Sequence, residues 1–92
     1  MSTCTQEFTI CNKLGMHARP AAQFVKRASK YTSSIWVEKD DEQVNGKSIM
    51  GLMMLAAGPG TSVTVSAIGP EAQAAVDAIA ALVADKFNEE GV

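Results

Sequence analysis

The residue best suited to chemistry in this 92-residue chain is its single histidine, His17. It lies in Leu14-Gly15-Met16-His17-Ala18-Arg19-Pro20, where a glycine-containing loop leads into a segment with helical spacing. A side chain at a helix start lies beside backbone N–H groups without an intrahelical partner and at the positive end of the helix dipole. Because an imidazole nitrogen is also a competent nucleophile, this position suits a histidine that accepts an anionic phosphoryl group.

Arg19 follows His17 by two residues, and its guanidinium could reach the same phosphoryl oxygens. Each contact with a helix dipole contributes only ~0.3–1 kcal/mol, so the group would be held transiently, as in a carrier. The plainer alternative is a helix-start histidine without chemical importance. Position alone favours that alternative, and the residues around His17 are what change the judgement.

Ser48 is the second candidate, because serine is a favoured N-cap and an apolar run follows it. The run, residues 49–55, is too long for one face of a short helix, so part of it should be exposed as an adaptable docking surface. Basic residues could ring this surface and steer acidic partners toward it, although each alone reads as a solvated residue. The expected docking residues are Met16, Ile49, Met50, Met53, Lys26, Arg27 and Lys47.

The elements that must position these residues follow from the spacing of apolar side chains. Alternation predicts strands over about residues 6–11, 34–38, 42–45 and 62–68, with a solvated turn at 38–42. Helical spacing predicts helices from Ala18, after Ser48, and from Gly69-Pro70-Glu71, with Pro70 in the favoured early position. The order β-α-β-β-α-β-α predicts two layers, with the helices on one face of a sheet whose other face meets solvent.

Length and composition exclude several classes of protein. The chain is 47% apolar, which excludes disorder, and its length predicts one domain, residues 1–92, with little room for a deep substrate pocket. A net charge of −2 argues against a nucleic-acid binder. No stretch is apolar enough to span a membrane, and no signal peptide is visible at the N-terminus, so the cytoplasm is the expected location.

The two cysteines, Cys4 and Cys11, are expected to be reduced and partly buried. Seven positions along one strand would separate them by ~23 Å at ~3.3 Å per residue, which is too far for a disulfide. The lone His17 does not complete a metal site with them. No metal and no cofactor are therefore expected.

Three segments resemble one known family. Residues 14–22, Leu-Gly-Met-His-Ala-Arg-Pro-Ala-Ala, resemble the active-site signature of HPr, the histidine-containing phosphocarrier family of the bacterial phosphotransferase system. Residues 47–51, Lys-Ser-Ile-Met-Gly, resemble the family's regulatory-serine segment, and residues 60–69 its last strand and turn. The likeness runs from about Glu7 to Phe87, and two motifs at the right separation are stronger than one short motif.

The resemblance implies an α+β fold, an open-faced sandwich of a four-stranded antiparallel sheet with three helices on one face. It implies that His17 takes a phosphoryl group on Nδ1 from phosphorylated enzyme I, supplied by phosphoenolpyruvate, and passes it to a IIA domain or protein. The Arg19 side chain would support the phosphoryl group electrostatically. Ala18 and Arg19 would contribute backbone N–H groups, and Pro20 would shape the turn. Ser48 would be the target of an HPr kinase/phosphorylase. The protein would act as a monomeric phosphoprotein in sugar transport or regulation, not as a turnover catalyst.

Two alternatives stay open. Residues 12–16 also resemble the nitrogen-branch variant, NPr, so the sequence does not decide between the sugar and nitrogen branches.

The second alternative belongs to another class of protein, because small ligand- or RNA-binding modules share this order of strands and helices. RNA recognition would need stacking aromatics on a basic sheet face, and only Trp36 and Tyr31 are candidates. A hydrolase would need a triad, and no second histidine exists to build one.

Overall fold

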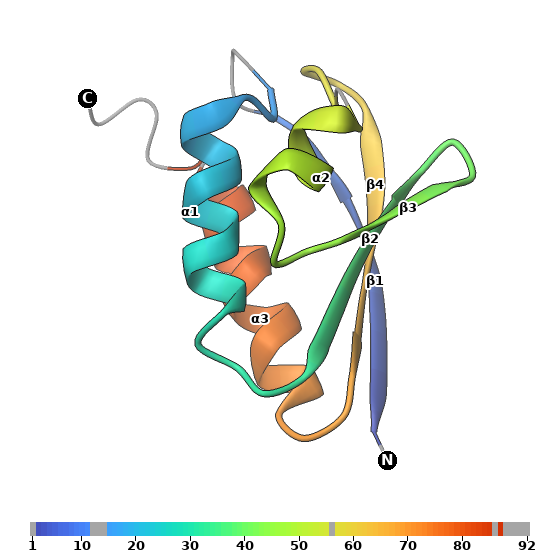
Figure 1. Ribbon diagram of the computed structural model, residues 1–92, viewed down its shortest axis with the longest axis vertical. Helices are drawn as coiled ribbons and strands as arrows, with labels where there is room; N and C mark the ends of the chain where they lie inside the picture. Colours follow the sequence, from blue (N-terminus) through green and yellow to red (C-terminus); the bar gives the residue numbers. More distant parts are fainter. Residues whose placement is uncertain (1, 12–14, 56, 86, 88–92) are drawn as a thin grey trace.

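The computed structural model describes residues 2–11, 15–55, 57–85 and 87. Four strands and three helices alternate along them in the predicted order β-α-β-β-α-β-α (Figure 1). The strands are β1 (Thr3–Thr9), β2 (Ser34–Lys39), β3 (Glu42–Asn45) and β4 (Ser62–Ile68). The helices are α1 (Ala18–Ala28), α2 (Ile49–Met54) and α3 (Ala72–Ala84). No helix in these described ranges is long and apolar enough to cross a membrane.

The four strands form one antiparallel sheet in the order β1-β4-β2-β3. The last long strand, β4, therefore lies between β1 and β2. The register places Thr5, Ser66, Trp36 and Asn45 in one row across the sheet. Because side chains alternate along a strand, this row shares one face, and that face is the one without helices.

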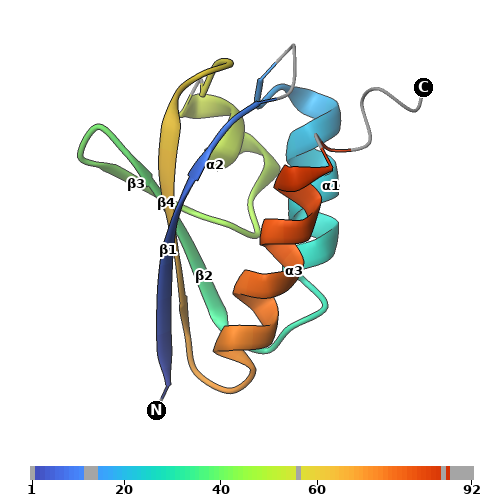
Figure 2. The same cartoon turned by 180° about the vertical axis from the view of Figure 1, so that it is seen from behind.

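The helices cover the other face of the sheet (Figures 1 and 2). The inward side chains of β4, Val63, Val65 and Ala67, are almost completely buried, as their alternation with Thr64 and Ser66 predicts. Phe24 of α1, Ile79 of α3 and Leu52 of α2 complete the core from the helical layer. The α+β open-faced sandwich is therefore confirmed.

The β2–β3 connection confirms the solvated turn that the charged residues predict. Asp40 and Asp41 both have positive φ, 51° and 68°, between the paired residues Lys39 and Glu42. Two left-handed residues make a two-residue turn whose twist matches that of the flanking strands. Aspartate tolerates this conformation better than most residues other than glycine.

Two expectations about local structure were wrong: the bounds of the first strand, with the burial of Cys11, and the place of Pro70. The first strand covers Thr3–Thr9, so Cys11 lies beyond it and is exposed. Pro70 lies before α3, whose N-cap is Glu71 at φ 68°. This strained residue is held because the Glu71 carboxylate accepts hydrogen bonds from the N–H and the hydroxyl of Thr32, both at 3.2 Å. The loop predicted at residues 12–14 lies outside the described residues.

Candidate functional site

His17 is the N-cap of α1. Its backbone is extended, with φ −104° and ψ −165°, and its carbonyl accepts the first intrahelical hydrogen bond, from the Ala21 N–H at 2.9 Å. The imidazole does not cap the helix, because it makes no hydrogen bond to the first-turn amides. The ring is therefore held at the helix start without being used to stabilise the helix.

The His17 side chain is half-buried, and its Nε2 atom is buried. The two nitrogens of an imidazole ring are chemically distinct, so burial of one of them limits what can reach it. A group that arrives from solvent would meet Nε2 only by displacing the atoms that surround it.

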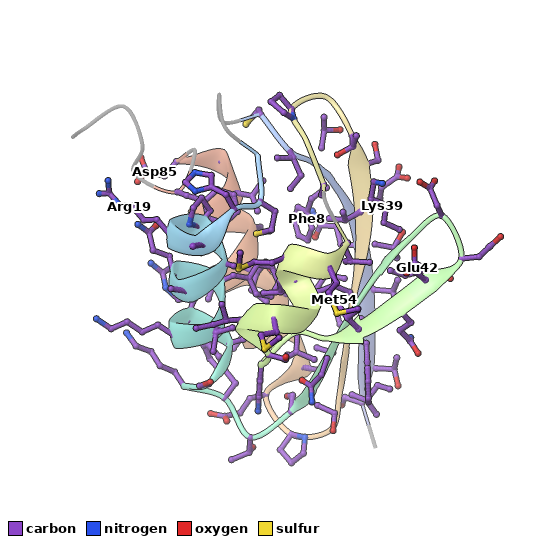
Figure 3. The ribbon with its side chains drawn as sticks, turned by 45° about the horizontal axis from the view of Figure 1, so that its top comes forward. Phe8, Arg19, Lys39, Glu42, Met54 and Asp85 are labelled. Atoms are coloured by element: carbon purple, nitrogen blue, oxygen red, sulfur yellow. The ribbon has the colours of Figure 1, made fainter. Side chains whose placement is uncertain are left out.

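The first turn of α1 places two amides beside this ring. The helix provides no acceptor for the N–H groups of Ala18 and Arg19, and Pro20 has no N–H to leave unsatisfied. No acidic residue in the first turn competes for an anion. The Arg19 side chain is exposed and extends outward at the start of the helix (Figure 3). Ala18, Arg19 and Pro20 are thus the first three residues of α1, directly after His17.

The loop before His17 is fixed by a close contact with a second loop. Gly15 has φ +69°, and a Cβ atom on it would lie 2.6 Å from the Ala57 carbonyl oxygen and 2.8 Å from the Gly58 Cα atom. The Met16 N–H donates a hydrogen bond to that same Ala57 carbonyl at 2.8 Å. The segment after α2 therefore sets the position of His17, a relation that sequence analysis missed because nothing local in the sequence signals it.

Ser48 is the N-cap of α2, as predicted, and its Oγ accepts a hydrogen bond from the Gly51 N–H at 3.0 Å. The chain reaches it through a tight turn, in which the Ser48 N–H donates to the Asn45 carbonyl and the Asn45 side chain accepts from the Lys47 N–H. The hydroxyl is half-buried. A modification there would act on the start of α2.

The apolar residues of α2 divide as the length of the run predicts. Leu52 and Leu55 are buried, whereas Ile49, Met50 and Met53 are 41%, 74% and 43% exposed. Met54 is 72% exposed and was missed, although its spacing of four from Met50 places both on one side of a helix. We refer to Ile49, Met50, Met53 and Met54 as the α2 patch.

Met16 was expected to extend this patch, and that expectation was wrong. Its side chain is 6% exposed and belongs to the hydrophobic core. The reason is the bond from its N–H to Ala57, which holds this part of the loop against the neighbouring segment. The neighbouring His17 is half-buried.

The expected basic residues do not form one ring. Arg27 donates from Nη1 to the Ala78 carbonyl of α3 at 3.1 Å, and Lys47 donates from Nζ to the Tyr31 carbonyl at 2.8 Å. Lys26 is exposed and lines a hollow with Arg27 on the side of α1 that faces α3. In the part of the chain that the structure describes, no cluster of three or more His, Cys, Asp or Glu side chains could hold a metal ion.

Comparison with known proteins decides the family. The family model described as the PTS HPr component phosphorylation site matches residues 4–85, most of the chain. The chain belongs to the HPr family. It is 46% identical to the phosphocarrier protein HPr of Cupriavidus necator over 84 residues, 91% of this chain and 94% of that protein. It is also 40% identical to the phosphocarrier protein NPr of Shewanella violacea over 89 residues, 97% and 98% of the two chains.

Solved structures of the HPr family agree with the fold. An HPr from Thermoanaerobacter tengcongensis superposes with a TM-score of 0.88 at 49% identity, and the match covers 97% of this chain and 98% of that one. The chain is thus a phosphocarrier of the phosphotransferase system. The RNA-binding alternative is not favoured, and the open sheet face carries the single tryptophan, Trp36, among largely hydroxyl and acidic side chains.

Proposed function

We propose that His17 accepts the phosphoryl group on Nδ1 and releases it to a second protein. The observation that carries this proposal is the placement of His17 as the N-cap of α1 with Nε2 buried. The two first-turn amides of Ala18 and Arg19 and the exposed Arg19 guanidinium then meet the new negative charge. None of these groups is buried with a full set of partners, so the support is weak enough for the group to leave.

The proposed donor is phosphorylated enzyme I, which draws its phosphoryl group from phosphoenolpyruvate, and the proposed acceptors are IIA domains or proteins. In the first step the P–N bond on His17 forms as the donor's bond to the phosphoryl group breaks, and in the second it breaks as the acceptor's bond forms, so the chain carries the group without turning over a substrate. We place this exchange in the cytoplasm, where the donor is made. Mixing the phosphorylated chain with a IIA protein tests the second half, and loss of phosphate from the chain with matching gain on IIA is expected. Release only as free phosphate would contradict it.

The α2 patch is the proposed docking surface for these partners. Four apolar side chains on a six-residue helix leave a contiguous exposed area that a monomer does not need. Methionine side chains adapt to differently shaped surfaces, which suits a carrier that binds a donor and several acceptors in turn.

Met50→Glu should weaken binding to enzyme I about tenfold, because a charge would enter an apolar contact, which corresponds to ~1.4 kcal/mol. Met50 is 74% exposed, so its replacement should change the free energy of unfolding by less than about 0.5 kcal/mol. Calorimetric titration and urea unfolding measure the two quantities. Ile68→Glu, on the open sheet face, is the matched control and should bind normally. Equal affinity for Met50→Glu would remove the patch from the docking surface.

We further propose that Ser48 is a regulatory phosphorylation site for an HPr kinase/phosphorylase. A phosphate on Oγ adds about −1.5 to −2 charges at neutral pH, and the Gly51 N–H that now bonds to Oγ can bond to it. The fold would tolerate this charge. The phosphoserine would then place an anion beside Ile49 and Met50. The docking of an acidic partner on these residues would weaken through charge repulsion and the cost of desolvating the phosphate.

Ser48→Asp should therefore stay folded and slow phosphoryl transfer to His17 about tenfold, roughly 1.4 kcal/mol in the barrier. Ser48→Asn is the matched control, since asparagine caps a helix as well as aspartate does but carries no charge. Its transfer rate should equal that of the unmodified chain. Rapid-quench assays of phosphoryl transfer from enzyme I measure the rates of both variants. Equal rates for Ser48→Asp and Ser48→Asn would contradict the regulatory role.

We propose that the chain exchanges phosphoryl groups as a monomer. Related structures include an HPr dimer from Thermoanaerobacter tengcongensis, 51% identical with a TM-score of 0.76, and a domain-swapped dimer of Crh from Bacillus subtilis, 48% identical.

The branch of the pathway follows from which IIA protein accepts the group fastest, since both HPr and NPr are relatives at similar identity.

A further inference from the structure

Helix α1 and the turn that follows it concentrate positive charge on a chain whose net charge is negative. Residues 18–30 contain four of the eight Lys and Arg residues and no acidic residue. Arg19 belongs to the phosphoryl site, whereas Lys26 and Arg27, which were expected at the docking surface, lie with Lys30 around a hollow that Leu82 and Asp85 also line. None of these three cations forms an ion pair with another described residue. The helix dipole favours cations in the last turn of a helix, so it accounts for the presence of these side chains. It does not account for the hollow that they surround.

These three cations line a hollow of about 520 Å³ between α1 and α3. Its volume falls in the range of small-molecule sites, ~300–1,000 Å³. The remaining lining residues are Gln23, Leu82 and Asp85. The hollow therefore combines three cations, an amide, an apolar side chain and a carboxylate.

Arg27 is the fixed point of this hollow. Its Nη1 donates to the Ala78 carbonyl of α3 at 3.1 Å, and the side chain is half-buried. A guanidinium has five N–H donors, so this bond leaves others available. Lys26 lies in the last turn of α1, and Lys30 lies in the turn that follows the helix. An oxyanion placed among these three side chains meets a guanidinium that is already positioned and two flexible ammonium groups.

The other end of the hollow has the opposite character. Figure 3 shows Asp85 at the same end of the molecule as Arg19, toward the start of α1, and Gln23 is the lining residue of α1 nearest that end. Gln23 lies in the middle of α1, whereas Lys30 lies beyond the C-terminal end of the helix. Asp85 would repel a phosphate but accepts hydrogen bonds from hydroxyls, as Gln23 does. A ligand that fits both ends has a phosphate at one end and hydroxyls at the other.

We propose that this groove binds a phosphorylated sugar, with the phosphate at Lys26, Arg27 and Lys30 and the hydroxyls toward Gln23 and Asp85. The site lies on the α3 side of α1, apart from the α2 patch. Binding there requires no phosphoryl transfer, so the proposal stands or fails independently of the role of His17. The open, mostly polar lining predicts weak binding that responds to metabolite concentrations in the cell.

The test is an NMR titration of the intact chain with glucose 6-phosphate at constant ionic strength, with glucose and inorganic phosphate as parallel probes. Glucose 6-phosphate should give saturable amide shifts in residues 23–30 and 82–85, and should bind at least about fivefold more tightly than phosphate, because the hydroxyls add hydrogen bonds. Glucose alone should give no saturable shifts. Shifts that rise linearly with concentration, or phosphate that binds as tightly as the sugar phosphate, would overturn the proposal.

Variants separate the groove from general attraction to a cationic chain. Lys30→Gln should weaken binding about two- to fivefold, as the loss of an exposed charge contact predicts, and the double variant Lys26→Gln/Lys30→Gln about tenfold. Asp85→Asn should reduce the preference for the sugar phosphate over phosphate. Lys39→Gln removes one charge beside Asp40 in the β2–β3 hairpin and should leave binding unchanged. An equal loss in Lys39→Gln would show that the net charge and not the groove is responsible.

Discussion

His17→Ala should abolish acid-labile labelling of the chain by enzyme I and phosphoenolpyruvate. The chain has one histidine, so no second imidazole can replace it, and the loss should exceed about a thousandfold, as for the removal of a covalent nucleophile. Labelling with radioactive phosphoenolpyruvate, followed by acid treatment, measures it. Undiminished acid-labile label on the variant would refute the assignment.

The same variant should keep its fold, which separates loss of chemistry from loss of structure. The His17 side chain makes no capping hydrogen bond, so its removal should lower the free energy of unfolding by at most about 1 kcal/mol. Arg19→Gln provides a graded comparison, because it removes one charge beside an intact acceptor. It should slow labelling about tenfold without abolishing it, the effect expected of a charged hydrogen bond worth ~1.5 kcal/mol.

Gly15→Ala should have the second-largest effect, on the position of His17 and on stability together. A Cβ atom would lie 2.6 Å from the Ala57 carbonyl oxygen, and the φ of +69° is strained for alanine. Backbone atoms on both sides must shift, so we expect a loss of about 2–4 kcal/mol in the free energy of unfolding. Urea denaturation measures this loss, and the rate of labelling by enzyme I should fall with it.

Two other glycines are matched controls for this steric argument. Gly60 also has a positive φ, 86°, but a Cβ atom there would meet nothing within 4 Å. Gly60→Ala should therefore cost only the strain of the left-handed backbone, about 1 kcal/mol. Gly58 has open space and no positive φ, and Gly58→Ala should be neutral or slightly stabilising. If all three variants lost equal stability, the contact between the two loops would not be what fixes the site.

The parts of the fold that depend on local side-chain patterns were predictable from the sequence. The alternation of apolar and polar side chains in residues 62–68 predicted both ends of β4 correctly. The serine before an apolar run predicted the capped start of α2. Both follow from physics that acts within one element, namely burial of alternate side chains and satisfaction of helix-end amides. The excess of apolar residues in α2 likewise predicted that some of them are exposed.

The errors concern contacts between segments that are distant in sequence. Met16 is apolar and adjacent to His17, and nothing near it in the sequence signals that its side chain is buried. The hydrogen bond from its N–H to the Ala57 carbonyl holds this part of the chain against a distant segment. Arg27 looks like any basic residue of an exposed helix, but its guanidinium reaches the α3 carbonyl of Ala78. Glu71 begins α3 in a left-handed conformation because Thr32, thirty-nine residues earlier, holds its carboxylate. No window of sequence contains both partners of these contacts.

The most direct test of the account is to locate the phosphoryl group on the intact chain after incubation with enzyme I and phosphoenolpyruvate. Nitrogen-15 NMR of the imidazole distinguishes the two ring nitrogens, and mass spectrometry under neutral conditions identifies the residue. The account predicts a single phosphoryl group on His17 at Nδ1, since Nε2 is buried. A group on Nε2, or on a residue other than His17, would contradict it.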